Sequence, residues 1–325
     1  MQKNGIALAG TEAMHAFDFA EKIRSSDTAF LSGIYARNPD EAAARFPGVQ
    51  LYGSYEQLLE DPHTEGIILA SEMKDHCRMI LQAAEKGRAL FVENGLCMDE
   101  NEAYLIRKAV QENGIIFVLS DPVRKPPFLL LKQWMEKQIC GAPVSLNIHM
   151  AGASGLKEDF SPAQAYIMPF SEGHGHHASA MLEWLMGKPA AVSASASAMS
   201  TGAKTHHAYD NAAAVFTYHS GVTGIIQMSA LEASKPYEAR VFCTAGELYA
   251  SKKEAGYRHA GKEWTFVPED KWPLPEPYIL DEWVRCIHEN RKPEMYGIDD
   301  AVIIAEMYSA IQKALGQNTI VGGDL

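Results

Sequence analysis

The sequence predicts a two-domain α/β protein, with a doubly wound parallel sheet at the N-terminus and an α+β domain after it, built on a large, mostly antiparallel, open-faced sheet. Three observations predict this fold class. The first 120 residues alternate short apolar runs with amphipathic stretches, which is typical of parallel strands covered by helices on both faces. From about residue 144, apolar and polar residues alternate over longer runs, as in antiparallel sheets. The length of 325 residues suits two domains of about 100–200 residues each.

Short apolar runs predict the five parallel strands of the first domain, at residues 5–9, 29–34, 66–70, 89–92 and 115–119. Three intervening helices are expected to start at acidic N-caps, over residues 40–46, 75–86 and 99–113. The last two helices are expected to end at Gly87 and Gly114, since glycine readily adopts the left-handed conformation that stops a helix. Such helices form right-handed crossovers between parallel strands. The first domain is therefore expected over residues 1–122.

The second domain, residues 123–325, is expected to hold six strands, at 144–150, 190–198, 212–218, 223–231, 238–244 and 247–250. Helical patterns occur at 176–186, about 277–290 and 299–316. The segment around Pro126 and Pro127 is interpreted as a loop.

Composition excludes several classes of function. The chain has 41 acidic and 29 basic residues, a formal net charge of −12 and no basic stripe, which argues against nucleic-acid binding. No run approaches the roughly 18 apolar residues of a membrane span, and no secretory leader is recognisable. Five scattered cysteines form no close pair and suggest reduced thiols in a cytoplasmic protein.

Several short segments occur in a characteristic order: Tyr35–Pro39, Phe91–Gly95, Glu183–Gly187, Asp210–Ala213, Gly221–Gly224 and Thr244–Leu248. In their order and spacing the chain resembles the Gfo/Idh/MocA family, the glucose–fructose oxidoreductase and inositol dehydrogenase family, nearly end to end. The resemblance implies a Rossmann-type first domain that binds NADP or NAD. It also implies a sugar, polyol or related substrate on the second domain, and a homodimer or homotetramer formed through the open sheet.

The loop after the first strand is the expected phosphate site, because glycines there let backbone amides and a helix N-terminus approach the pyrophosphate. The candidates are Gly10, Thr11 and Glu12. Only one glycine of the usual three is present, and a carboxylate at Glu12 would oppose the phosphates by about 1–4 kcal/mol. An ordinary strand-to-helix turn is therefore an open alternative.

Other cofactor contacts are expected beyond the second and third strands. Arg37 and Asn38 stand where NAD enzymes carry an acidic residue, and an arginine there favours NADP, whose extra phosphate it accommodates. A solvated loop charge is the alternative for Arg37. The resemblance adds Ser71 and His76 on the nicotinamide side, although His76 would equally suit a helix start without a ligand.

The resemblance also indicates where catalysis would occur. The family's Glu-Lys-Pro triplet is Glu93-Asn94-Gly95 here, so an uncharged amide replaces the lysine. The family's aspartate position falls on a glycine, with Glu172 beside it, and its histidine position falls on His177. Since imidazole titrates near neutral pH, His177 is the expected acid/base residue, with Glu172 as its partner.

Three further residues are candidates for binding substrate. Lys125 could supply the positive charge that Asn94 lacks, and His174 and His176 belong to a polar, glycine-flanked segment. The histidine cluster also invites a metal hypothesis, but it lacks the i, i+4 spacing that puts two ligands on one helix face, so no metal is expected.

Three functions remain open. The leading hypothesis is an NAD(P)-dependent oxidoreductase of a sugar or polyol with an altered site. The second is a degenerate family member that serves as a ligand-binding or regulatory protein. The third is a histidine-based lyase or hydrolase, with or without a metal.

Overall fold

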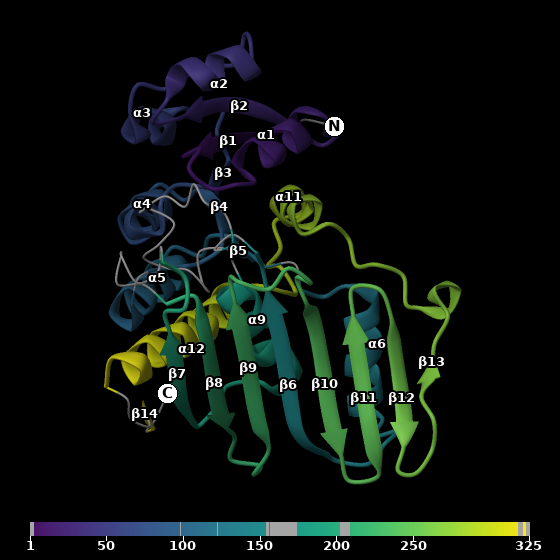
Figure 1. The fold of residues 1–325 in the computed structure, drawn as a ribbon. Coiled ribbons are helices and arrows are strands. Elements are labelled where there is room, and N and C mark those ends of the chain that lie inside the picture. Colours follow the sequence, from purple (N-terminus) through teal and green to yellow (C-terminus); the bar gives the residue numbers. More distant parts are fainter. Residues whose placement is uncertain are drawn as a thin grey trace. The chain divides into compact units, whose positions relative to one another are not determined.

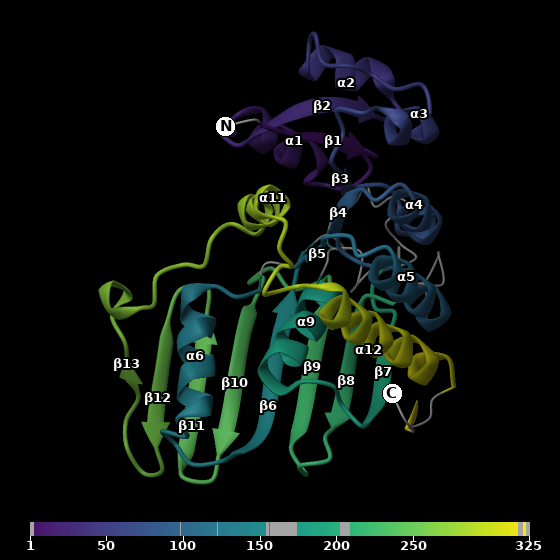
Figure 2. The same cartoon turned by 180° about the vertical axis from the view of Figure 1, so that it is seen from behind.

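The computed structural model describes residues 3–97, 99–121, 123–153, 156, 174–201, 209–317 and 321–322 (Figures 1 and 2). It divides into two compact units. The first comprises Met1–Asp121 and Pro277–Ala305, and the second comprises Pro122–Glu276 and Glu306–Leu325. No helix in these described ranges is both long and apolar enough to cross a membrane.

The first unit is built on a five-stranded parallel sheet in the order β2-β1-β3-β4-β5, as the apolar runs predict. All four residues of β3 and all five of β4 are buried, because helices cover both faces. The strands are β1 (Asn4–Ala9), β2 (Ala29–Tyr35), β3 (Gly66–Leu69), β4 (Ala89–Glu93) and β5 (Phe117–Ser120).

The helices of this unit lie on the two sides of the sheet. Phe19 and Trp283 both contact Phe91, with ring centroids 5.2 and 5.7 Å away, so their two helices share one side. The other side carries α4 and α5, which pack against each other (Figure 1). The helices are α1 (Ala16–Arg24), α2 (Pro39–Arg45), α3 (Tyr55–Glu60), α4 (Met73–Glu85), α5 (Glu100–Glu112) and α11 (Ile279–Glu289).

The expected acidic caps are confirmed for one helix of three. Asp99 caps α5, with Oδ1 accepting from the amides of Asn101 and Glu102 at 2.8 and 3.0 Å. For α2 and α4 the prediction is wrong, because these helices begin earlier, at Pro39 and Met73. The fixed φ of proline suits the first helical position, which explains the early start of α2.

The segment Pro277–Ala305 belongs to the first unit, although the sequence placed everything after residue 122 in the second. The physical reason is Trp283, which is fully buried in the first unit. Gly66 leaves room for it, because a Cβ on that glycine would lie only 2.8 Å from the Trp283 ring. Helix α11 thus completes the covering of the parallel sheet.

The second unit is built on a nine-stranded sheet in the order β13-β12-β11-β10-β6-β9-β8-β7-β14. Among the described strands of this sheet, only β6 and β9 pair in parallel, which confirms the mostly antiparallel prediction. The strands are β6 (Pro143–Ala151), β7 (Ala191–Ser197), β8 (Asn211–Thr217), β9 (Thr223–Ser229), β10 (Tyr237–Cys243), β11 (Gly246–Ser251), β12 (Ala255–His259), β13 (Thr265–Phe266) and β14 (Val321–Gly322).

Helices cover one face of this large sheet. They are α6 (Pro126–Glu136), α9 (His174–Met186) and the part of α12 (Ile298–Gln317) that belongs to this unit (Figure 2). The opposite face carries no helix in the described part of the chain, and residues along β8 alternate between buried and exposed (Figure 1). The sheet is therefore open-faced, as expected. The loop interpretation around Pro126 is wrong, because two prolines at the start of α6 are compatible with its first turn.

Candidate functional site

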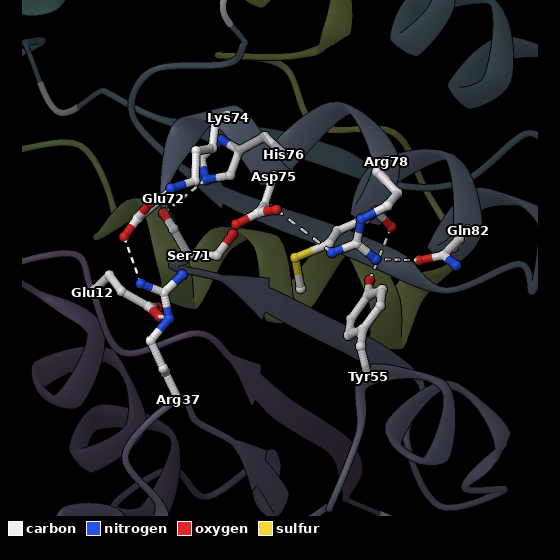
Figure 3. A network of polar contacts seen from close by, with 11 residues as sticks. Glu12, Arg37, Tyr55, Ser71, Glu72, Lys74, Asp75, His76, Arg78 and Gln82 are labelled. Atoms are coloured by element: carbon white, nitrogen blue, oxygen red, sulfur yellow. Dashed lines mark hydrogen bonds and ion pairs between the residues drawn. The ribbon is translucent and has the colours of Figure 1, made fainter.

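The edge formed by the carboxyl ends of β1 and β3 is the topological switch point of the first unit. The chain runs from β1 to β2 on one side and then returns past β1 to β3 on the other. Open α/β sheets bind their ligands at such an edge, where the loops that follow neighbouring strands run to opposite sides of the sheet. Figure 3 shows the polar residues gathered near this edge.

Gly10 directly follows β1 and has a left-handed backbone conformation. Its φ is +88°, and an added Cβ would lie 2.5 Å from the backbone nitrogen and Cα of Ser71. Its amide donates to the Tyr35 carbonyl at 2.8 Å. The loops after β1, β2 and β3 therefore meet at a point where only glycine fits.

Thr11 and Glu12 follow Gly10, where further glycines would be expected in a dinucleotide-binding loop. The amide of Thr11 donates to Oε2 of Glu12 at 2.8 Å, so a carboxylate occupies an amide that could otherwise face a phosphate. Oε1 of the same carboxylate lies 3.2 Å from Nε of Arg37. The Glu12 carboxylate thus binds both a backbone amide of this loop and the Arg37 guanidinium.

Arg37 lies between two carboxylates. Besides Glu12, its Nη1 donates to Oε1 of Glu72 at 2.7 Å (Figure 3). The hydrogen bond to Glu72, followed by the charges of Glu72 and Glu12, raises the pKa of Arg37. The lysine Lys74 also pairs with Glu72. Asn38 is exposed at the N-cap position of α2, where its side chain makes no capping bond.

His76 is almost fully buried and contacts backbone carbonyls rather than open space. Nδ1 lies 2.9 Å from the Gly95 carbonyl oxygen and 3.2 Å from that of Leu96, and Nε2 lies 3.1 Å from that of Ser71. Burial lowers its pKa although these carbonyls favour protonation. His76 is 2% exposed, so it holds the loop after β3 against the loop after β4 and positions both.

Ser71 and the triplet after β4 lie at the same edge of the sheet as the loop after β1. Within the described chain, the Ser71 hydroxyl oxygen is buried without a hydrogen-bond partner. Glu93, at the end of β4, is 8% exposed, and Asn94 beside it is half-buried. Burial raises the pKa of Tyr278, and nearby carboxylates including Glu93 add to that effect.

The candidate histidines of the second unit lie on α9. His176 is 5% exposed and stacks on Tyr308 of α12, with ring centroids 4.5 Å apart and planes at 25°. Its neighbour His177 is half-buried. His174 begins α9, and its side chain is outside the described residues, as is all of Glu172.

Lys125 stands at the N-cap position of α6, with its Nζ 5.1 Å from the centroid of the Tyr237 ring. Lys252 lies against the same ring at 4.2 Å. Sequence reasoning missed Lys252 and Tyr237, because they are far from Lys125 in the chain and no linear pattern connects them.

Among the residues that the structure describes, no group of three or more His, Cys, Asp or Glu side chains is placed to hold a metal ion. Glu172 and the side chain of His174, which belong to the same segment of the sequence, lie outside those residues.

The backbone of the first unit is compatible with a bound dinucleotide, whereas one side chain, that of Glu12, opposes it. The switch point, the left-handed Gly10 and its close approach to Ser71 would form the backbone of a pyrophosphate site. The Glu12 carboxylate must leave the Thr11 amide before a phosphate can take its place. Gly10, Thr11 and Arg37 would then hold the phosphates and ribose.

Two family models match this chain and place it in a class of oxidoreductases. Residues 5–120 match the oxidoreductase family with an NAD-binding Rossmann fold, and residues 128–249 match the GFO/IDH/MocA C-terminal domain. The chain belongs to the Gfo/Idh/MocA family of NAD(P)-binding oxidoreductases.

Known proteins of this kind resemble the chain over most of its length. It is 23% identical to scyllo-inositol 2-dehydrogenase (NAD(+)) of Bacillus subtilis (strain 168) over 283 residues, 81% of this chain and 79% of that protein. Its fold matches an oxidoreductase from Agrobacterium radiobacter in complex with NAD+, L-tartaric acid and magnesium, with a TM-score of 0.83, 15% identity, and 99% and 98% of the two chains covered. It also matches aldose-aldose oxidoreductase from Caulobacter crescentus, with a TM-score of 0.80, 15% identity, and 99% and 100% coverage.

Proposed function

We propose that this family member interconverts an alcohol and a carbonyl on a sugar, polyol or related compound, with His177 as the acid/base residue. One observation carries the proposal. Of the two adjacent histidines in the first turn of α9, His176 is buried by stacking on Tyr308, whereas His177 is half-buried. His177 is therefore the imidazole with access to a bound substrate. The inositol dehydrogenase relative supports a polyol-like substrate.

In this proposal, His177 accepts the hydroxyl proton during oxidation and returns it during reduction. A nicotinamide, when bound, supplies or accepts the hydride. Asn94 orients the substrate oxygen by hydrogen bonding but cannot stabilise developing negative charge as an ammonium would. Glu93 and Glu172 are proposed as the carboxylates near the reaction.

The cofactor preference follows from Arg37. Its guanidinium is held at the end of β2 by two carboxylates, and a 2′-phosphate would compete for the same donors. We therefore keep NADP as the favoured cofactor. We also propose a cytoplasmic protein that assembles as a homodimer or homotetramer through the open sheet, with no nucleic-acid partner.

A second candidate function is favoured by one contact. The Glu12 carboxylate satisfies the Thr11 amide internally, which suits a ligand-binding or regulatory protein that has given up hydride chemistry. The two functions differ in whether nucleotide binds.

Thermal unfolding with and without NAD or NADP separates them. Nucleotide at 100 times its dissociation constant should stabilise the protein by about 2.7 kcal/mol. We expect this shift with both nucleotides and a tighter Kd for NADP. No shift with either nucleotide would establish the regulatory alternative.

The role of His177 is tested by turnover with a panel of inositols, alditols and aldoses. We expect His177→Asn to lower kcat by about 10²–10⁴-fold, since proton transfer contributes that much in general acid–base catalysis. His219→Asn, in the exposed turn after β8, is the matched control and should leave kcat unchanged. Wild-type turnover in the His177 variant would contradict the assignment.

A further inference from the structure

Two lysines of the second unit share one aromatic ring. The Nζ atoms of Lys125 and Lys252 lie 5.1 and 4.2 Å from the centroid of the Tyr237 ring. Pairing of Glu238 with Ser251 brings the start of β10 beside the end of β11 and so places Tyr237 next to Lys252. Lys125 lies at the start of α6. Phe128 in the first turn of the same helix also contacts Tyr237, with ring centroids 5.7 Å apart.

Neither lysine has an acidic partner within the described ranges of the chain, and most other lysines that approach a neighbour do. Lys86 and Lys188, for example, pair with Glu60 and Glu306 at 2.6 and 2.9 Å. A cation–π contact of about 0.5–2 kcal/mol explains one ammonium on a tyrosine ring. It does not explain why a second cation is brought to the same ring, because the two positive charges repel each other.

Electrostatics of the cluster agree with the geometry. The pKa of Lys125 is lowered by burial and then by the charge of Lys252, and burial lowers the pKa of Lys252 as well. No carboxylate among the described residues counteracts these effects. The first turn of α6 contains no acidic residue, so no side chain there compensates the positive end of the helix dipole. Positive charge is thus concentrated at a place where the described protein supplies no anion.

We propose that Lys125 and Lys252 form a subsite for an anionic group of the substrate, the carboxylate or phosphate of an acidic sugar or polyol, bound beside Tyr237. This inference rests on the proposed function, because it assigns a class of substrate to the same enzyme. An anion bound there offsets the repulsion between the two ammonium groups and forms charge-assisted hydrogen bonds with them. A neutral polyol leaves the repulsion in place.

The test is direct binding of small probes to the full chain without nucleotide, measured by calorimetry. Gluconate and glucuronate provide a carboxylate, glucose 6-phosphate provides a phosphate, and glucitol and glucose are the neutral controls. We expect at least one anionic class to bind about 10-fold or more tightly than its neutral counterpart, because hydrogen bonds to charged groups are strong. The class that binds identifies the source of the anion.

Two variants and a matched control locate the binding. Lys125→Met and Lys252→Met should each weaken the anion by about 10-fold and leave the neutral probes unchanged. Lys253→Met removes an adjacent exposed lysine and should change nothing. Lys252 lies in the connection between β11 and β12, outside both strands, so its replacement leaves the fold intact.

Anions that bind no better than the neutral probes, or bind equally well in both lysine variants, would overturn the subsite. Since nucleotide is absent, this outcome is independent of hydride transfer. Lysine-dependent anion binding without any nucleotide-linked turnover would instead retain the subsite and reject the proposed function.

Discussion

Glu12 is the residue in which this chain departs most clearly from a dinucleotide-binding loop. A glycine at this place would expose the Thr11 amide, whereas here the carboxylate accepts from that amide and also pairs with Arg37. The Glu12 side chain can rotate away from the Thr11 amide, but its negative charge would remain near the phosphates of a bound nucleotide. Glu12 should therefore weaken nucleotide binding without preventing it.

Removing this charge should strengthen nucleotide binding. We expect Glu12→Ala to lower the Kd for NAD about 5-fold, since like charges 4 Å apart in water repel by about 1 kcal/mol. Fluorescence titration at low ionic strength measures it. Glu41→Ala, an exposed acidic residue in the first turn of α2, is the control and should leave the Kd unchanged. Equal or weaker binding by the Glu12 variant would show that the carboxylate does not oppose the cofactor.

Single residues differ in how far sequence could predict them. Gly10 was predictable, because a strand-to-helix turn at a ligand edge demands a left-handed residue. His177 was identified only through its spacing from Trp184 and Gly187 in a family motif. Lys252 could not be paired with Lys125, because only the pairing of β10 with β11 and the place of α6 bring them to one ring.

At the scale of elements, His76 connects the start of α4 with the loop after β4. Its ring is buried among three backbone carbonyls, and that loop carries Asn94 at the family's lysine position. The sequence placed His76 at the nicotinamide. The structure gives it the carbonyls of two loops as partners, so it acts on the site by positioning them.

This arrangement makes stability depend on pH. The pKa of His76 is lowered from 6.5 by burial, so the unfolded chain binds its proton more readily than the folded chain does. The free energy of unfolding should therefore fall as pH drops below about 6.5 and level off below the lowered pKa. In His76→Gln this fall should be shallower.

Urea unfolding at a series of pH values between about 5 and 8 provides the measurement. His63→Gln removes an exposed histidine of the same unit and should retain the wild-type pH dependence. The same slope in wild type and His76→Gln would contradict the role of burial at this imidazole.

Strands and helices with strong apolar periodicity were predicted well. Elements without such a pattern, such as a helix that starts with prolines or a short strand at a sheet edge, were not. The five parallel strands lie within two residues of their expected bounds, because buried strands need continuous apolar runs. Helix α6 was missed, since two prolines suggest a loop when their place at a helix start is unknown. Strands β12 and β13 were also missed; they extend the sheet edge with short, partly exposed segments.

For the whole molecule, the open face of the nine-stranded sheet is the feature that points to assembly. Ala213, Val215 and Thr217 of β8 are exposed there, and Val215 is 37% exposed. Apolar side chains on an uncovered sheet are stabilised when another surface covers them. A second copy of this chain is the occupant that the family resemblance predicts.

The molar mass measured by light scattering on the purified protein should then correspond to a dimer or tetramer. Val215→Lys should shift this mass toward that of the monomer. A buried lysine without a partner is costly at an interface, which is the reason for the shift. Leu105→Lys introduces the same charge at an exposed position on α5 and should keep the wild-type mass. A monomeric wild-type protein, or an unchanged Val215 variant, would reject assembly through this face.

The pattern of apolar residues alone was enough to predict two domains, their fold classes and most strands. Burial of one face makes apolar residues recur every 2 residues in a strand and every 3.6 residues in a helix, and this repeat is visible in the sequence. Motif order added the family. Long-range packing decided the rest. It assigned Pro277–Ala305 to the first unit through Trp283, buried His176 against Tyr308, and gathered Lys125 and Lys252 on Tyr237. These contacts join residues far apart in sequence, so no local pattern encodes them.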